Sequence, residues 1–220
     1  MSPKNDDKAS RRRSGTREKI IEIAESLIAR HGPDDFQLQN ITDLLGLTPP
    51  AIYNHFKDRD ELVAHVAEKG GRILAERMRT PAGEDVLTSL RRNARIYVRF
   101  LAENPAYPRL ILWELSRHGT VAWPGLAASA ITIRERMRVD FEKGAKEGVI
   151  RKVRVEFDLQ YFYIGAAAAS VWTDYDDPLS DLENFPGSIE KSPEEVERLM
   201  DEAEEFVVRM FSPEREDSKG

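Results

Sequence analysis

The sequence predicts an all-α fold of about nine helices, and three observations lead to this prediction. Apolar residues recur three and four positions apart through most of the 220-residue chain, which is the period of a helix. Glycine and proline stand where this pattern stops, as they do at the ends of helices. No segment shows the strict alternation of apolar and polar residues that is typical of a strand.

The composition is that of a globular protein, with 40% hydrophobic and 33% charged residues. The absence of cysteine excludes disulfides, thiolate metal sites and a cysteine nucleophile. No run of about 18 apolar residues predicts a transmembrane helix, and the N-terminus lacks the apolar core of a secretory signal. We therefore expect a cytoplasmic protein without a membrane segment.

Charge is distributed unevenly along the chain. Residues 1–17 carry six basic and two acidic side chains, whereas residues 158–220 carry five basic and 17 acidic ones. Charged surfaces act locally, because salt screens them within about 10 Å. The net charge of −6 is therefore compatible with nucleic-acid binding, and we expect DNA to meet the N-terminal end.

The N-terminal region is expected to comprise a flexible basic arm, residues 1–15, and a small helical domain, residues 16–62. Thr16 is the expected N-cap of a first helix that ends at His31. A short helix from Leu38 to Leu45 follows and ends at Gly46. The apolar positions that we expect inside these two helices are Ile20, Ala24, Leu27, Ile41, Leu44 and Leu45.

A proline pair begins the next helix. Thr48 is a preferred N-cap residue, and Pro49 and Pro50 fall at the first two helical positions, where no backbone N–H is needed. The Thr48 hydroxyl is expected to accept a hydrogen bond from the Ala51 N–H. The result is a rigid helix of barely two turns. It is expected to bury Ile52 and Phe56 and to leave Tyr53, Asn54, His55 and Lys57 outward.

The remaining residues, 63–220, are expected to form a larger helical domain for ligand binding and dimerisation. A capping box of Asp58 and Glu61 opens a helix that runs towards Arg79 and joins the two domains. Helices are then expected over 84–103, 109–116, 124–147, 158–172 and 193–211, with an acidic loop over 173–192.

Two short helices joined by Gly46-Leu47-Thr48 have the layout of a helix-turn-helix, whose second helix enters the major groove by its N-terminal end. Hydroxyl, imidazole and ammonium groups suit phosphate oxygens, and the amides of Gln39 and Asn54 suit base edges. The proline rings can contact a thymine methyl group. A helical hairpin that binds no DNA has the same periodicity, so the spacing leaves both interpretations open.

The particular residues resemble the N-terminal domain of the TetR family of bacterial transcriptional regulators. The resemblance covers about Thr16–Val66 and is most specific at G-L-T-P-P-A-I-Y-N-H-F-K-D-R-D-E-L. It implies a DNA-binding domain followed by helices for dimerisation and for an inducer. It also implies phosphate contacts by Gln37, Tyr53, His55, Lys57 and Arg59, and contacts with bases or sugar edges by Gln39, Pro49, Pro50, Ala51 and Asn54.

Other features leave alternatives open. The basic arm at Ser10–Ser14 either follows a minor groove or phosphates, or is a solvated tail. The arginines at positions 92, 95 and 99 either face an anion or form a solvated face. The four histidines lack metal-ligand spacing, and neither phosphate-loop nor hydrolase motifs occur. We expect no metal, no cofactor and no enzymatic activity.

The C-terminal domain offers two further expectations. Helices 158–172 and 193–211 are expected to meet their copies in a homodimer, since Gly165–Ser170 are small; packing within one chain is the alternative. Aromatic residues are candidates for an inducer pocket, although aromatic residues at helical spacing more often belong to a plain core. These candidates are Tyr97, Phe100, Trp113, Phe162, Tyr163 and Trp172.

Together these features predict a homodimeric, ligand-responsive regulator that a small molecule releases from a pseudo-palindromic operator. The sign of regulation is expected to be repression. A DNA-binding architectural protein without a small-molecule input is the alternative.

Overall fold

The computed structural model describes residues 3–79, 81, 83–117, 121–152, 163–167 and 191–213. All regular secondary structure in these residues is helical, which confirms the predicted fold class. Residues 163–167 form a short helical segment. The other helices are α1 (Pro3–His31), α2 (Leu38–Leu45), α3 (Pro49–Ile52), α4 (Arg59–Arg77), α5 (Val86–Glu103), α6 (Ala106–Ser116), α7 (Trp123–Lys146) and α9 (Pro193–Phe211).

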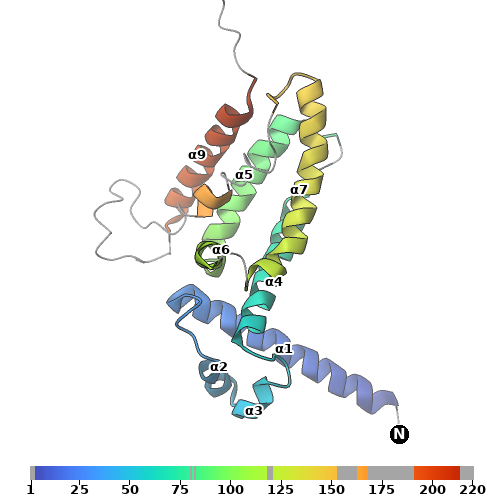
Figure 1. Cartoon of the computed structure of the whole chain (residues 1–220), viewed down its shortest axis with the longest axis vertical. Coiled ribbons are helices and arrows are strands. Elements are labelled where there is room, and N and C mark those ends of the chain that lie inside the picture. Colours follow the sequence, from blue (N-terminus) through green and yellow to red (C-terminus); the bar gives the residue numbers. More distant parts are fainter. Residues whose placement is uncertain are drawn as a thin grey trace, which may run out of the picture.

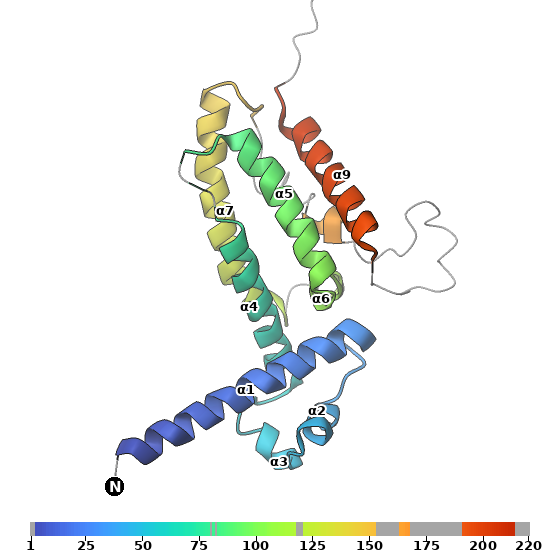
Figure 2. The same cartoon turned by 180° about the vertical axis from the view of Figure 1, so that it is seen from behind.

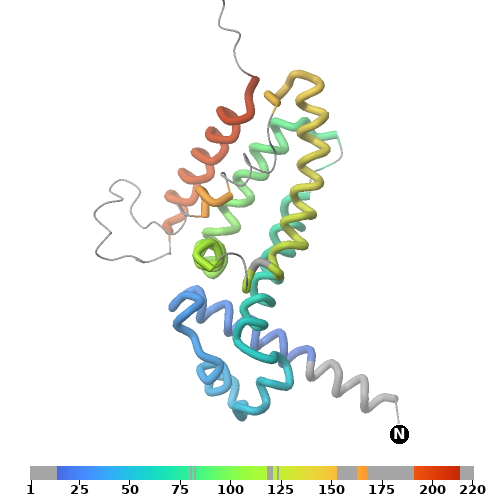
Figure 3. Tube along the Cα trace, viewed as in Figure 1, coloured from blue at the N-terminus to red at the C-terminus, as the bar shows by residue number. Residues whose placement is uncertain are grey.

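The helices form two groups that share α4 (Figure 1). Helices α1, α2 and α3 lie at one end of the molecule, and α5, α6, α7 and α9 lie at the other. Figure 3 shows that α4 runs without a break from the first group into the second, where it lies beside α7. Among the described residues, no helix is both long and apolar enough to cross a membrane.

The first group has a compact apolar core. Ile20, Ala24 and Ile28 of α1 are fully buried, as the predicted stripe requires. They pack with side chains from the other three helices, because these residues all belong to one buried cluster. The buried side chains contributed by α2, α3 and α4 include Ile41, Ile52, Leu62, Val63 and Val66.

The beginning of α1 differs from the prediction. Thr16 is not an N-cap, because the helix begins at Pro3 and passes through Gly15 without interruption. Proline is well tolerated in a first turn, and the lysine, alanine and arginine residues that follow have high helix propensity, which offsets the cost of one glycine. The backbone of residues 3–15 is therefore helical, and α1 extends beyond α3 (Figure 2).

The C-terminal group is built on two close helix pairs. Helix α7 crosses α4 with almost no space at Gly125, where an added Cβ would lie 2.1 Å from the Ala64 carbonyl oxygen. The second pair is α5 and α9. Helix α9 has the bounds that its periodicity predicts, and it buries Leu199, Met200, Ala203, Val207 and Phe211.

The arginines at positions 92, 95 and 99 of α5 pair with carboxylates of the chain itself, and Arg99 is exposed. Arg92 makes a two-oxygen contact with Glu84 at 3.0–3.1 Å. Arg95 pairs with Asp201 and, at 2.8 Å, with Glu197. Carboxylates of α9 thus occupy the side of α5 that the sequence left unassigned.

Some bounds shift by a few residues. Helix α5 begins after the N-cap Asp85, whose carboxylate accepts from the Thr88 N–H at 3.0 Å. The hydrogen bond with the Thr88 side chain, and then this backbone bond, lower the pKa of Asp85. Helix α6 begins at Ala106 because Pro108 fits within a first turn. Most of the predicted helix 158–172 and of the loop 173–192 lies outside the described residues, as do Phe162 and Trp172.

Candidate nucleic-acid interface

The turn between α2 and α3 depends on one glycine. Gly46 has a φ of 62°, a conformation that costs a side-chain-bearing residue energy. It ends α2, and the next amide, that of Leu47, donates to the Thr42 carbonyl at 2.9 Å. At the other end of α2, the Asn40 side chain accepts from the Gln37 N–H at 2.9 Å. Both ends of this short helix are therefore fixed locally.

Helix α3 begins at its proline pair, as predicted, but its cap is different. Thr48 is the N-cap residue in an extended conformation, with Pro49 and Pro50 next. Its hydroxyl makes no capping bond; the Ala51 N–H donates to the Thr48 backbone carbonyl at 2.8 Å instead. The helix is one turn long and continues as turns, with the Phe56 N–H donating to the Ile52 carbonyl at 3.1 Å. The two predicted helical turns were thus too many.

The inner and outer faces of this segment are those that the sequence predicts. Ile52 and Phe56 are each 1% exposed, whereas Tyr53 is 58% exposed. Ala51 and His55 are half-buried. The predicted contact residues that are fully on the outside are Gln37, Gln39, Thr48, Pro49, Pro50, Tyr53, Asn54 and Lys57.

Arg59 does not lie with the other predicted phosphate-contacting residues. Its guanidinium carbon is 5.1 Å from the centre of the Phe36 ring, and its Nη2 is 3.7 Å from an oxygen of Asp34. Only 28% of the side chain is exposed, against 87% for Lys57. Arg59 therefore stabilises the start of α4, and Lys57 is the outward cation beside α3.

Leu44 is another departure. Its predicted inward position is wrong, since it is 65% exposed, while Ile41 is fully buried and Leu45 is half-buried. In a helix, a residue four positions after Ile41 returns to the same face more closely than one three positions after it, so Leu45 takes the inner place. Leu44 lies beside Asp43, whose carboxylate accepts from the Gln39 amide at 2.8 Å.

A contact network behind α3 was not found by sequence analysis. The Arg17 guanidinium lies 4.9 Å from the Phe56 ring centre and 2.7 Å from Nε2 of His65. The His65 ring meets Phe56 edge-on, with ring centres 5.7 Å apart, and its Nδ1 is 2.9 Å from a Glu68 oxygen. These contacts hold the end of α3 against α1 and α4. The contact between Arg17 and His65 joins residues 48 positions apart, so no local motif indicates it.

The interface is joined to the C-terminal group through Asp34, in the turn after α1. One Asp34 oxygen accepts from the Trp113 indole N–H of α6 at 2.7 Å, and the other faces Arg59. Lys69 of α4 also pairs with Glu25 of α1 at 2.6 Å. Trp113 thus contacts the DNA-binding end rather than the predicted pocket.

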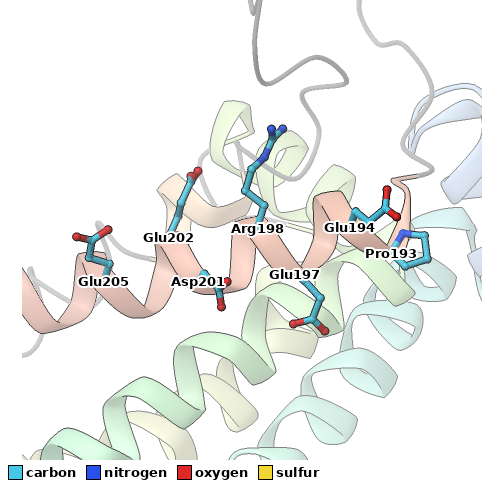
Figure 4. A pocket seen from close by; sticks show the side chains of 7 residues that line it. All are labelled: Pro193, Glu194, Glu197, Arg198, Asp201, Glu202 and Glu205. Atoms are coloured by element: carbon cyan, nitrogen blue, oxygen red, sulfur yellow. The ribbon is translucent and has the colours of Figure 1, made fainter.

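The other aromatic candidates separate into two places. Tyr97 donates to the Tyr163 carbonyl at 3.1 Å, and their rings meet edge-on. Phe100 instead packs on Tyr107, 5.1 Å away. Among the described residues, the outer side of α9 has a hollow of about 540 Å³ that none of these aromatics lines (Figure 4). Five acidic side chains, Arg198 and Pro193 line it.

Within the described ranges, no group of three or more histidine or carboxylate side chains is arranged to hold a metal ion.

Comparison with known proteins identifies the N-terminal region. Residues 20–66 match the family model described as bacterial regulatory proteins of the tetR family. These residues include all of α2 and α3, the buried stripe of α1 and the first part of α4.

The fold as a whole is also found in solved structures. A TetR family transcription regulator from Marinobacter aquaeolei VT8 is 17% identical with a TM-score of 0.63, covering 93% of this chain and 99% of its own. The ketosteroid transcriptional regulator KstR2 of Mycobacterium tuberculosis is 15% identical with a TM-score of 0.66, covering 90% and 95%. A tetR-family regulatory protein from Rhodococcus RHA1 is 19% identical with a TM-score of 0.65, covering 87% and 96%.

The matched residues contain the proline-led helix α3 and its outward polar side chains. The helices that follow are arranged as in these solved regulators. Residues 20–66 thus match the helix-turn-helix DNA-binding domain of the tetR family of bacterial regulatory proteins, and the chain as a whole has the fold of solved TetR family regulators.

Proposed function

We propose that this DNA-binding regulator is a homodimeric repressor that leaves a pseudo-palindromic operator when a small molecule binds its C-terminal helices. The observation that carries the DNA-binding part is the outward face of α3, where Tyr53 is 58% exposed above a buried Ile52 and Phe56. A recognition helix whose inner side is fixed in a core keeps its register on DNA, because its end does not fray.

The roles of the contact residues follow from their chemistry. Tyr53, His55 and Lys57 donate to phosphate oxygens, and Gln37 does so from the start of α2. Asn54 and Gln39 carry amides that can pair with base edges, whereas the rings of Pro49 and Pro50 contact a thymine methyl group. Arg59 is left out of this set because it faces Asp34 and Phe36.

Dimerisation would place two copies of α3 in successive major grooves, about 34–36 Å apart. The apolar face of α9 already packs on α5, so a second chain would meet a different face of α9. That face carries Phe206, which is 47% exposed. Gly165 in the segment 163–167 is also exposed, and an added Cβ would meet nothing within 4 Å. These two positions support an interface between copies, with light scattering as its test: a monomer at micromolar concentration would refute it.

Coupling between ligand and DNA would use the joint at Asp34. Helix α6 holds Asp34 through Trp113, and Asp34 faces Arg59 at the first residue of α4. A ligand that moves α6 or α4 would therefore change the position of α3 relative to its copy. Such a ligand shifts the population of DNA-competent molecules by no more than its difference in affinity for the two states.

The test of DNA binding uses a duplex of the region upstream of the protein's own gene and fluorescence anisotropy at several salt concentrations. Tyr53→Ala is expected to weaken binding to all sequences, since a phosphate contact carries no sequence information. Asn54→Ala is expected to change the preference at one base position, at a cost of roughly 1–3 kcal/mol. Unchanged affinity in both variants would contradict the assignment of α3 as the reading helix.

A further inference from the structure

A row of polar side chains lies on the inward face of α5. Ser89, Asn93 and Tyr97 are four residues apart, so they share one side of the helix. Their exposed fractions are 4%, 3% and 3%. Their neighbours on this helix face are apolar, including Leu90 and Ala94, which are also buried. Three polar groups in an apolar interior require hydrogen-bond partners.

Asn93 lacks one of these partners. Its Nδ2 lies 3.5 Å from the Ser89 Oγ, which is the longest separation at which a hydrogen bond forms. Its Oδ1 is shielded from solvent and has no partner in the described part of the chain. Exchanging the two atoms of the amide would not remove the problem, because the other atom would then lack a partner.

The other buried polar atoms without a partner lie elsewhere. They belong to Arg59, Tyr107 and Arg109, within the described residues. Arg59 and Arg109 lie near the turn after α1, since Arg59 faces Asp34 and Arg109 approaches Gly32. The ring of Tyr107 fills the space above Gly70, where an added Cβ would be 1.8 Å away. Among the described residues, Asn93 thus differs from the other unsatisfied groups in its place on α5, whereas Tyr107 and Arg109 belong to α6 and Arg59 to the start of α4.

Few polar atoms surround the three polar side chains of α5 among the described residues. Tyr97 donates to the Tyr163 carbonyl, and Tyr163 donates to the Met137 sulfur at 3.4 Å, a weak acceptor. Burial raises the pKa of Tyr97 and of Tyr163, so both hydroxyls stay protonated. The apolar wall is supplied by α7, whose buried side chains at four-residue spacing are Ile133, Met137 and Phe141.

A charged ligand would find no counter-charge here. Among the described residues, the buried charged side chain is Glu114, and its two oxygens accept from the Val121 and Ala122 amides at 2.8 and 2.7 Å. These bonds cap the start of α7 and satisfy the carboxylate. Transfer of an unpaired charge into such an interior is very costly.

We propose that Asn93 is the polar anchor of the inducer site, and that the inducer is an uncharged, mainly apolar molecule whose hydroxyl or N–H group donates to Asn93 Oδ1. The molecule would lie between α5, α7 and the segment 163–167. A ligand hydroxyl can also accept from Tyr163, whose bond to the Met137 sulfur is a weak one. The inference rests on the proposed ligand-responsive function.

The test compares two pairs of probes of equal heavy-atom number. One pair is 1-decanol and 1-methoxynonane, and the other is 4-hydroxybiphenyl and 4-fluorobiphenyl; decanoate serves as the charged analogue. Binding to the full chain is measured by thermal shift and calorimetry. We expect the donor-bearing member of at least one pair to bind roughly three- to tenfold more tightly than its partner, the worth of one hydrogen bond. Decanoate is expected to bind more weakly than 1-decanol.

The variant Asn93→Leu separates an anchor from a structural residue. Leucine has a similar volume and no polar atom, so the variant is expected to lose the preference for the donor-bearing probe and to keep or raise its Tm. A lower Tm with an unchanged preference would assign Asn93 a structural role and overturn the proposal. Equal binding of both members of each pair to the original chain, or no binding of any probe, would overturn it too.

Operator binding distinguishes this inference from the function on which it rests. Wild-type protein and Asn93→Leu are expected to bind the upstream duplex equally without probe. The donor-bearing probe is expected to release only the wild-type protein. If both proteins bind DNA and neither responds to a probe, the inducer inference fails while DNA binding stands. If neither binds DNA, the proposed function itself fails.

Discussion

The two ends of the molecule use polar side chains in opposite ways. Around α3, Tyr53, Asn54 and Lys57 lie on the outside, over a mainly apolar core in which Thr42 is also buried. Around α5, the charged side chains are largely occupied by partners from other helices, as Arg95 is by Asp201 and Glu197. The first region presents its polar groups to an external partner, and the second uses most of them to hold helices together.

The difference indicates which feature marks a functional site in each region. At the α3 end, exposed polarity marks the site, although some of these groups also bond within the chain, as the Gln39 amide does with Asp43. At the α5 end, exposed polarity is mostly structural, and the informative feature is instead a buried group without a partner, Asn93. Three experiments test the comparison, in order of decreasing effect.

The largest effect is expected at the close crossing of α4 and α7. Gly125→Ala would place a Cβ 2.1 Å from the Ala64 carbonyl oxygen, which is backbone and cannot rotate away. The helices must separate, at an expected cost of about 1–3 kcal/mol in the free energy of unfolding. Urea denaturation measures this cost. Gly15→Ala, inside helix α1, is the matched control, since its added Cβ meets nothing within 4 Å.

A smaller and more specific effect is expected from Lys57→Ala and Arg59→Ala, which remove adjacent cations. Lys57→Ala should reduce the slope of log affinity for DNA against log salt concentration by about 0.9, the value for one phosphate contact. Arg59→Ala should leave this slope nearly unchanged and lower stability, because the side chain packs on Phe36 and faces Asp34. Equal slope changes in both variants would contradict the separate roles assigned to the two residues.

The smallest effect is expected from the ion pairs between α5 and α9. Arg95→Ala removes contacts with Glu197 and Asp201, but Asp201 is 72% exposed. Solvent screens such pairs, so each contributes at most about 1 kcal/mol. A double-mutant cycle with Asp201→Ala, measured at low and high salt, should give a coupling energy that shrinks as salt increases. A coupling well above that size would show that α9 depends on charge more than on its buried apolar face.

Local patterns predicted most of the helices near the DNA-binding end. The bounds of α2 and α9 follow from Gly46 and from Ser192-Pro193, and the Asp58 cap accepts from the Glu61 N–H at 2.8 Å. In contrast, the start of α1 was misplaced, because Thr16 fits a cap while the residues before it also favour a helix. Local signals determine the end of a helix only where the residues beyond it do not also favour a helix.

The candidate site was predictable to the same extent. Exposure of Tyr53 and burial of Phe56 follow from spacing on one helix. The Arg59 side chain points inward because Phe36 and Asp34 are near it. These two residues lie between α1 and α2, so the spacing around Arg59 does not indicate them. The position of Trp113 similarly depended on where α6 crosses the end of α1. Aromatic spacing therefore indicated burial and could not indicate which aromatic residues meet.

The amino-acid sequence alone predicts that this chain is helical and that a proline-led helix presents polar side chains at one end. These features arise from backbone geometry and periodicity, which act over four residues or fewer. The tertiary structure decided which charged groups are paired, where Arg59 and Trp113 point, and that Asn93 lacks a partner. Those outcomes depend on contacts between residues far apart in the chain, and only packing brings such residues within hydrogen-bonding distance.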